Sequence, residues 1–402
     1  MQSRSGEGYK NVRMHVLVPT SSGFGRSDGS TEPKPSIATP RDTKLRKEHE
    51  YRVPVVSVDG NPLMPTTPAK ARKLIKGKQA IGKWSKLGIF YIQMQRPVGD
   101  RTQEVAFGLD PGSKFEGVAV VSKEKVLQTG MNILPKGIVK KLEQKRRQRR
   151  FRRYRKTWRR PARFDNRTRA EGWIAPSQKA KVDFRLKIIE ELKKLYPITK
   201  AVVEDVRFNH YKKRWGKHFS TVEIGKKRTY DKLIEWFGEV RLISGVETGE
   251  IRKEYRAKKV SEKREKSVYS HAIDAVVIAA KETGLGLLMI PSFFIWRRYQ
   301  YPRRQLHKSQ FKKGGIRRRE GGSNSMEGFR KGDVVLYRGE LARGGGYREG
   351  IGLSLHQFDT DNKRFTQRAK PSDCIRLFNQ KIMYEQPIPP TTEVVGFLGG
   401  AP

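Results

Sequence analysis

Three short motifs each place an acidic residue where a hydrophobic run ends or on one face of a helix. Asp110 ends the apolar run in FGLDPGS, Glu204 ends the run in AVVEDV, and Asp274 lies in SHAIDAVVIAA. The first two runs predict buried β-strands and the third predicts an apolar helix, which together indicate an α/β core. Carboxylates that meet inside such a core need compensation, and divalent metal ions supply it.

The rest of the chain is strongly basic. Its 402 residues include 86 Lys and Arg against 41 Asp and Glu, a formal net charge of +45. This balance predicts a polyanionic partner such as nucleic acid. A membrane surface is the competing polyanion, but no apolar run of about 18 residues is present to span a bilayer. Cys374 is the single cysteine, so we expect no disulfide framework, no zinc site built from cysteine pairs, and an intracellular compartment.

Composition and periodicity divide the chain into segments. Residues 1–50 have little periodicity and predict a disordered leader. A strand, an Asp-Gly turn and a helix with Thr67 as its N-cap follow, and then a β-hairpin that contains Asp110. Helices are predicted at 182–196 and 267–281, on either side of the buried strand that ends at Glu204. Short strands after a Gly-rich basic linker predict a small C-terminal β-barrel.

The acidic residues have the chemistry of a nuclease site. Asp110, Glu204 and Asp274 would supply oxygen ligands for two Mg²⁺ ions about 4 Å apart, with Mn²⁺ as a substitute. His271 precedes Asp274 by three residues, so both should share one helix face, where His271 would orient or deprotonate the attacking water. Taken singly, each residue has a structural alternative: Asp110 as a turn cap, Glu204 as a lysine partner, and His271 with Asp274 as a surface hydrogen bond.

Residues 140–160 form the most basic stretch, with 13 Lys or Arg among 21 residues. They predict a helix of about 32 Å, on which Phe151, Tyr154 and Trp158 form one stripe. We expect the stripe to dock on the protein core and the arginines to face phosphates, whereas the alternative is a solvated charge run. The arginines proposed to bind nucleic acid are Arg146, Arg147, Arg149, Arg150, Arg152, Arg153, Arg155, Arg159 and Arg160.

A second basic group surrounds the loop LARGGGYREG in the C-terminal module. Arg338, Arg343, Tyr347 and Arg348 cluster there in the sequence. Arginine reads guanine edges through two hydrogen bonds, so these three arginines are candidates for reading a DNA motif. The alternative is that they contact only backbone phosphate or RNA.

The ordered motifs resemble those of the IscB group of transposon-encoded proteins. VDGNPLMP is similar to the PLMP module of that group, FGLDPGSKFEG, AVVEDV and SHAIDAVVIAA are similar to its three RuvC motifs, and the arginine-rich run is similar to its bridge helix. Glu204 and His271 are only 67 positions apart, and the interval holds His210 and His218 but no HNH pattern. The chain therefore resembles the IsrB form, which lacks the HNH domain.

The resemblance implies a fold and an activity. The fold would be α/β, an RNase H-like RuvC core split by an arginine-rich bridge helix, with a small N-terminal PLMP module and a C-terminal β-barrel-like module. The activity would be RNA-guided nicking of the non-target DNA strand, by a monomeric ribonucleoprotein with a guide ωRNA in a prokaryotic cytoplasm. The implied segments are a leader (1–50), the PLMP module (51–100), RuvC part I (101–135), the bridge helix (136–168), RuvC part II (169–215), RuvC part III with a connector (216–300), a basic linker (301–325) and a flanking-motif (TAM) interacting module (326–402).

Two rival functions share part of this pattern. A RuvC-like junction resolvase or transposase would have the same acidic site and act without guide RNA. A purely RNA-binding scaffold would have the basic helix but no need for three carboxylates together.

Overall fold

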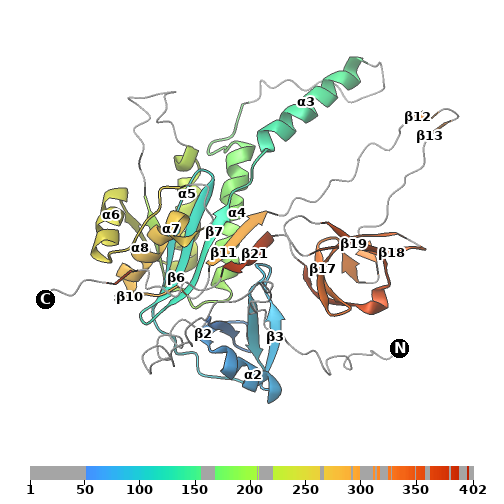
Figure 1. Cartoon of the computed structure of the whole chain (residues 1–402). Coiled ribbons are helices and arrows are strands. Elements are labelled where there is room, and N and C mark those ends of the chain that lie inside the picture. The colour runs from blue at the N-terminus through green and yellow to red at the C-terminus, as the bar shows by residue number, and fades with distance from the viewer. Residues whose placement is uncertain are drawn as a thin grey trace, which may run out of the picture. The chain divides into compact units, whose positions relative to one another are not determined.

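The structure is a computed structural model of the whole chain (Figure 1). It describes residues 51–154, 168–205, 207, 221–262, 267–290, 293–298, 311–312, 315–316, 325–326, 328–348, 350–357, 363–379, 382–388 and 396–397. The leader expected at residues 1–50 and most of the linker expected at 301–325 lie outside these ranges.

The first described segment is a small sheet with one helix. Its elements are β1 (Val53–Val56), β2 (Pro62–Thr66), α2 (Pro68–Lys76), β3 (Ala80–Trp84) and β4 (Phe90–Met94). The strand order is β2-β1-β4-β3, with β1 and β4 parallel. The Thr67 hydroxyl accepts a hydrogen bond from the Lys70 N–H, and Pro68 occupies the first turn, where no amide hydrogen is needed. The predicted N-cap is therefore confirmed.

A seven-stranded sheet forms the centre of the fold, in the order β21-β11-β7-β6-β5-β8-β9. The three strands β5, β6 and β7 form an antiparallel meander, which confirms the predicted hairpin, and β8 and β9 continue parallel to β5. The strands are β5 (Val105–Asp110), β6 (Phe115–Ser122), β7 (Val126–Ile133), β8 (Lys200–Glu204), β9 (Val240–Ile243), β11 (Phe293–Arg298) and β21 (Ile382–Ile388).

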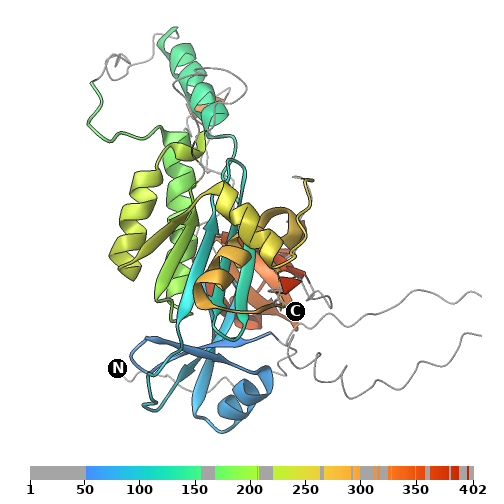
Figure 2. The ribbon, with the colours of Figure 1, turned by 90° about the vertical axis from the view of Figure 1, so that its left-hand side faces the viewer.

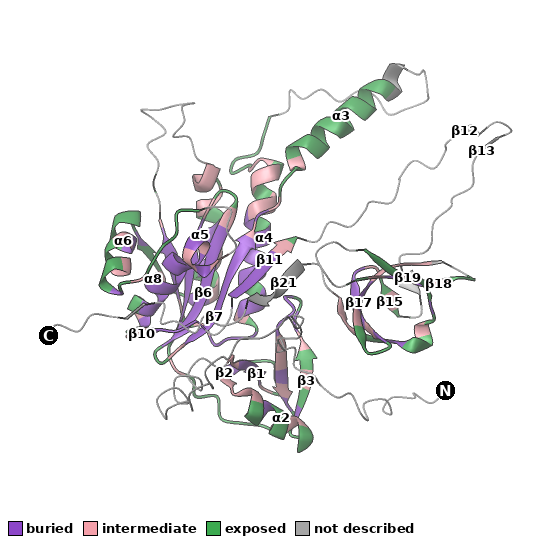
Figure 3. Ribbon diagram, viewed as in Figure 1, coloured by how far each residue is buried: buried purple, intermediate pink, exposed green. Residues whose placement is uncertain are grey.

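Helices cover both faces of this sheet, so the core is a mixed α/β fold. Figure 2 shows α4 and α5 (green to yellow-green) on one side of the sheet and α8 (orange) on the other. The strands β5, β6 and β8 are buried on both faces (Figure 3), which explains their largely apolar sequences. The helices are α3 (Ile138–Tyr154), α4 (Pro176–Lys193), α5 (Lys226–Phe237), α6 (Gly245–Glu254), α7 (Val268–His271) and α8 (Ile273–Thr283), with a 3₁₀ turn η1 (Thr221–Glu223).

Helices α7 and α8 lie close to the sheet because a glycine faces each of them. A Cβ on Gly108 of β5 would lie 2.0 Å from the Ala275 carbonyl oxygen, and one on Gly117 of β6 would lie 2.1 Å from the His271 carbonyl oxygen. Neither neighbour can move easily, because both are backbone atoms. Gly108 therefore sets the distance between α8 and the sheet, and Gly117 sets the distance between the end of α7 and the sheet.

The helix expected as one piece over 267–281 is two helices. Ala272, with φ −116° and ψ −12°, ends α7 and precedes α8. The side chain of Ser267 caps α7 by accepting from the Ser270 N–H. The three-residue spacing between His271 and Asp274 therefore does not place them on one continuous helix face, and that expectation is corrected.

A separate five-stranded antiparallel sheet forms the C-terminal module, in the order β19-β18-β17-β16-β20, with its own apolar core. Residues 382–388, expected in this module, instead form β21 beside β11 in the central sheet. The elements are β16 (Asp333–Tyr337), β17 (Glu340–Arg348), β18 (Gly352–Gln357), β19 (Arg364–Ala369), η2 (Pro371–Asp373) and β20 (Cys374–Asn379). Short ladders join β10 (Leu287–Leu288) to β22 (Gly396–Phe397), β12 (Phe311–Lys312) to β13 (Gly315–Ile316), and β14 (Ser325–Met326) to β15 (Phe329–Arg330).

The close approach of α8 makes Gly108 a test of the fold. We expect Gly108→Ala to lower the free energy of unfolding by about 1–3 kcal/mol, because the added methyl group has no space against the Ala275 carbonyl. Gly99→Ala is the matched control, since its Cβ would meet nothing within 4 Å. Urea unfolding of both variants measures the difference, and equal stability would show that the helix can move away from the sheet.

Candidate metal centre

The fold brings the three predicted acids together. Asp110, Glu204 and Asp274 each present a carboxylate oxygen, and these oxygens all lie within 4.8 Å of one another. Strands β5 and β8 are parallel neighbours, with Leu109 paired to Val203, so Asp110 and Glu204 follow at the same end of the sheet. Asp274 comes from the first turn of α8, which packs on those two strands.

The three side chains differ in exposure to solvent. Asp274 is 2% exposed and Glu204 is 8% exposed, whereas Asp110 is half-buried at the end of its strand. The donor set consists only of carboxylate oxygens, which are the ligands that hard cations such as Mg²⁺ prefer. In kind and in spacing the residues therefore fit a divalent metal ion, and they could bind one.

Burial and mutual repulsion perturb the protonation of these acids. Burial, followed by the charges of Glu204 and Asp274, raises the pKa of Asp110 well above its usual value. Burial also raises the pKa of Glu204, although a hydrogen bond from the Asp110 side chain opposes the rise. The cluster therefore retains a proton more readily than isolated carboxyls do, and binding of a cation would displace it.

Two cations contact the most buried of the three acids. The Arg252 Nη1 atom lies 2.7 Å from Asp274 Oδ1, and the Lys259 ammonium pairs with Asp274 Oδ2. Arg252 belongs to α6, and Lys259 lies in the segment that follows it. Neither cation was predicted from the sequence, because both stand within a run of similar basic residues that gives no signal for one position over another.

Asp205 anchors the strand end that carries Glu204. Its carboxylate accepts hydrogen bonds from Lys226 Nζ and the Tyr230 hydroxyl, both at 2.8 Å, and from Arg207 Nε at 2.9 Å. Burial alone would raise the pKa of Asp205, but these donors lower it to about 2. The neighbouring acids of AVVEDV thus have opposite surroundings: Glu204 faces carboxylates, and Asp205 faces donors that tie it to α5.

His271 has a different position from the one expected. Its ring lies 4.6 Å, between centroids, from that of Phe115, and it is not a member of the carboxylate cluster. Its role as an orienting or basic group therefore stays a prediction without support from a shared helix face.

The basic helix α3 is exposed along Val139–Phe151, with the side chains of Arg146, Arg147, Arg149 and Arg150 all on the surface. Phe151 is 67% exposed, so the expected docking of an aromatic stripe on the core is wrong at this residue. The side chains of the other stripe residues and arginines lie outside the described residues: Arg152, Arg153, Tyr154, Arg155, Trp158, Arg159 and Arg160.

The three arginines expected to read DNA from the C-terminal module also differ in their exposure to solvent. Arg338 is exposed, with its guanidinium 5.2 Å from the Tyr337 ring centroid. Arg343 is 1% exposed, so the expectation that it presents its side chain at the surface of this module is corrected. The side chain of Arg348 lies outside the described residues.

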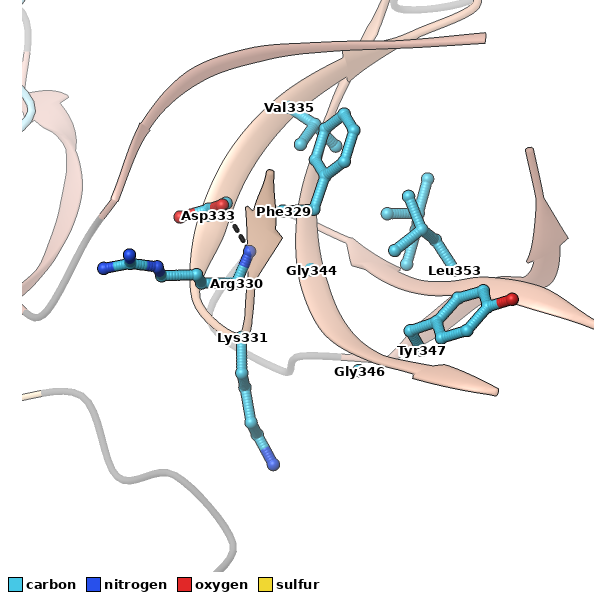
Figure 4. Close-up of a pocket in the computed structure, with 10 residues that line it drawn as sticks. Phe329, Arg330, Lys331, Asp333, Val335, Gly344, Gly346, Tyr347 and Leu353 are labelled. Atoms are coloured by element: carbon cyan, nitrogen blue, oxygen red, sulfur yellow. Dashed lines mark hydrogen bonds between the residues drawn. The ribbon is translucent and has the colours of Figure 1, made fainter. Parts of the chain in front are cut away.

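The same module has a small pocket, whose lining includes Phe329, Lys331 and Tyr347 (Figure 4). Beside it the Arg330 N–H donates to the Asp333 carboxylate, at 2.6 Å. Burial lowers the pKa of Lys331. The lining of the pocket combines apolar residues and glycines with the charged residues Arg330, Lys331 and Asp333.

Part of the chain matches the model of a known protein family. Residues 53–224 match the family model described as RRXRR protein. The match covers the first two acids and α3. A solved structure described as T. thermophilus RuvC in complex with Holliday junction substrate aligns at 14% identity and a TM-score of 0.25, over 44% of this chain and 90% of that one. No curated protein matches the sequence. In the described part of the chain, no helix has the length and apolar character needed to cross a membrane.

The raised pKa of Asp110 gives a prediction for stability. A carboxyl whose pKa rises on folding stabilises the fold at low pH and loses that contribution as the pH rises through the folded-state value. Asp110→Asn should therefore melt at a higher temperature than the unchanged chain at pH 7.5 without divalent ions, and this gain should shrink towards pH 4. Thermal unfolding at several pH values measures it, and a destabilised variant at pH 7.5 would contradict the account.

Added Mg²⁺ should raise the melting temperature of the unchanged chain more than that of the Asp110→Asn variant.

Proposed function

We propose that this chain is a nuclease that hydrolyses a phosphodiester bond of nucleic acid at Asp110, Glu204 and Asp274. One observation carries the proposal: three carboxylates converge within 4.8 Å in a chain of formal net charge +45. Such a cluster has little value for stability, because its members repel each other and are partly removed from water. Clusters of carboxylates with perturbed pKa values are typical of functional sites, where they bind a cation or take part in a reaction.

The residues of the site have two roles, metal binding and the positioning of a metal ligand. Asp110, Glu204 and Asp274 would hold Mg²⁺, and Asp205 fixes the end of β8 so that Glu204 points at the other two. When bound, divalent ions lower the pKa of a coordinated water and neutralise charge that develops on the phosphate oxygens.

The finer proposal is RNA-guided nicking of DNA. It rests on the ordered resemblance of the PLMP, RuvC and bridge-helix motifs to the IscB group, in the form without an HNH domain. The part of the chain that the structure describes holds one acidic cluster, which suits cleavage of one strand. The exposed arginines of α3 would contact backbone phosphates of the guide RNA or of its duplex with target DNA. The C-terminal module, through residues such as Arg338, would contact the flanking motif.

Removal of any of the three acids should abolish cleavage. We expect Asp110→Ala, Glu204→Ala and Asp274→Ala each to lose nicking of a matched supercoiled plasmid in Mg²⁺ while RNA binding is retained, because each removes an oxygen ligand. Asp231→Ala, an exposed acid on α5, is the control and should cut at the rate of the unchanged chain. Full activity of the Asp110→Ala protein would refute the site. Linear rather than open-circular product would show a second nuclease centre.

The arginines of α3 should set the salt dependence of RNA binding. Replacing Arg146, Arg147, Arg149 and Arg150 by Ala should lower the log–log slope of affinity against salt by about 0.7–0.9 for every phosphate that the variant no longer neutralises. The control replaces Lys70, Arg72, Lys73 and Lys76 of α2 by Ala, which removes the same number of positive charges. If α3 contacts the phosphates, this control should leave the slope unchanged. An unchanged slope for the α3 variant in filter binding would mean that α3 is a solvated surface.

The rival without guide RNA is tested by the RNA that co-purifies with the chain. A single long RNA species with one variable end supports guidance, and sequencing identifies the matching target. Metal-dependent cutting of branched DNA by RNA-free protein would favour the resolvase or transposase instead.

A further inference from the structure

Hydrogen bonds hold the end of α6 and the segment that follows it, which carry the two cations that pair with Asp274. Tyr255, fully buried, donates its hydroxyl to the Leu285 carbonyl at 2.6 Å, which fastens the end of α6 to the segment after α8. Arg256 has the left-handed backbone conformation, with φ 52°, and the Ala257 N–H donates a hydrogen bond to the Arg252 carbonyl. The Val260 N–H then donates to the Tyr269 carbonyl. Arg252 thus extends from the last turn of α6, and Lys259 from the hydrogen-bonded segment that follows it.

The two cations lie on the solvent side of the cluster. The side chain of Asp274 is 2% exposed, whereas those of Arg252 and Lys259 are 26% and 38% exposed. Both cations therefore contact the acidic cluster through Asp274 and remain accessible to a molecule that arrives from solvent.

A phosphodiester that approaches this cluster meets three negative charges. Two unit positive charges beside them would offset that repulsion and give the phosphate direct partners, since guanidinium and ammonium groups both bind phosphate oxygens. An ion pair that served only to neutralise Asp274 would need one cation, and it would be most favourable away from solvent screening. Two half-exposed cations on one carboxylate fit a role towards a second anion.

We propose that Arg252 and Lys259 bind the scissile phosphate, so that they exchange their contacts with Asp274 for the non-bridging oxygens of the phosphodiester when nucleic acid enters the site. This inference rests on the proposed nuclease function and adds the residues that contact its substrate. Release of Asp274 from the two cations also leaves both of its oxygens available to a metal ion. The substrate phosphate and the metal therefore support each other's binding.

The phosphate-binding role and a role in which the cations only orient Asp274 predict opposite changes in Mn²⁺ affinity when one cation is removed. If they only orient it, Lys259→Met leaves a poorly placed carboxylate, and both metal binding and cleavage become weaker. If they bind phosphate, removal of a positive charge that competes for Asp274 shifts Mn²⁺ binding to lower concentration in the absence of nucleic acid, while cleavage falls. Opposite changes in the two measurements thus identify the phosphate-binding role.

The experiment uses the full chain with its co-purified RNA and a matched DNA. Single-turnover cleavage by Lys259→Met and by Arg252→Gln should be slower by about 10²-fold or more, the scale seen when one donor to a developing anion is removed. Lys259→Arg should recover part of the rate. Lys258→Met, which removes the same charge from the adjacent exposed residue, should cut as the unchanged chain does. Mn²⁺ titration calorimetry of RNA-free protein, with Glu204→Gln as a blank, gives the second measurement.

The outcomes separate this inference from the proposed function. Cleavage by Lys259→Met and Arg252→Gln at the unchanged rate overturns the inference and leaves the nuclease intact. Weaker Mn²⁺ binding together with weaker cleavage also overturns it, in favour of a role in orienting Asp274. Failure of the unchanged chain to cut any nucleic acid, despite Mn²⁺ binding at the cluster, overturns the proposed function and this inference with it.

Discussion

The close contact of α8 with the central sheet is the constraint on which the site depends. Gly108 faces α8 and Gly117 faces the end of α7, and neither has a side chain that would hold its helix away, so the first turn of α8 reaches the strand ends of β5 and β8. Asp274 is in that turn, and its carboxylate is therefore fixed against those of Asp110 and Glu204. The apolar residues on both sides of the sheet fix this arrangement, because α8 is buried along nearly its whole length.

Bringing the carboxylates together has an electrostatic cost that the surroundings only partly offset. Arg252 and Lys259 pair with Asp274, whereas Asp110 and Glu204 face each other and keep raised pKa values. Asp205, one residue from Glu204, shows the contrast: three donors surround it and its pKa falls to about 2. The fold thus supplies donors to Asp274 but leaves Asp110 and Glu204 facing each other, which is the property expected of a site that binds a cation.

Much of this architecture was predictable from local sequence, because an acid after a short apolar run marks a strand end and Thr67 before Pro68 marks a helix start. Long-range features were not. The return of residues 382–388 to the central sheet depends on a partner far away in sequence, and the break at Ala272 separates α7 from α8 without a proline or glycine to signal it. The inward direction of Arg343 and the outward direction of Phe151 both oppose the usual preference of their residue types.

The central claim is that Asp110, Glu204 and Asp274 bind divalent metal ions jointly. Anomalous X-ray diffraction from crystals of the protein soaked in Mn²⁺ tests it most directly, because the signal locates the ion independently of any activity. The account predicts Mn²⁺ coordinated by oxygens of all three carboxylates, and loss of that signal in crystals of Asp110→Asn. Mn²⁺ bound only elsewhere at saturating concentration, or an unchanged signal in the variant, would contradict it.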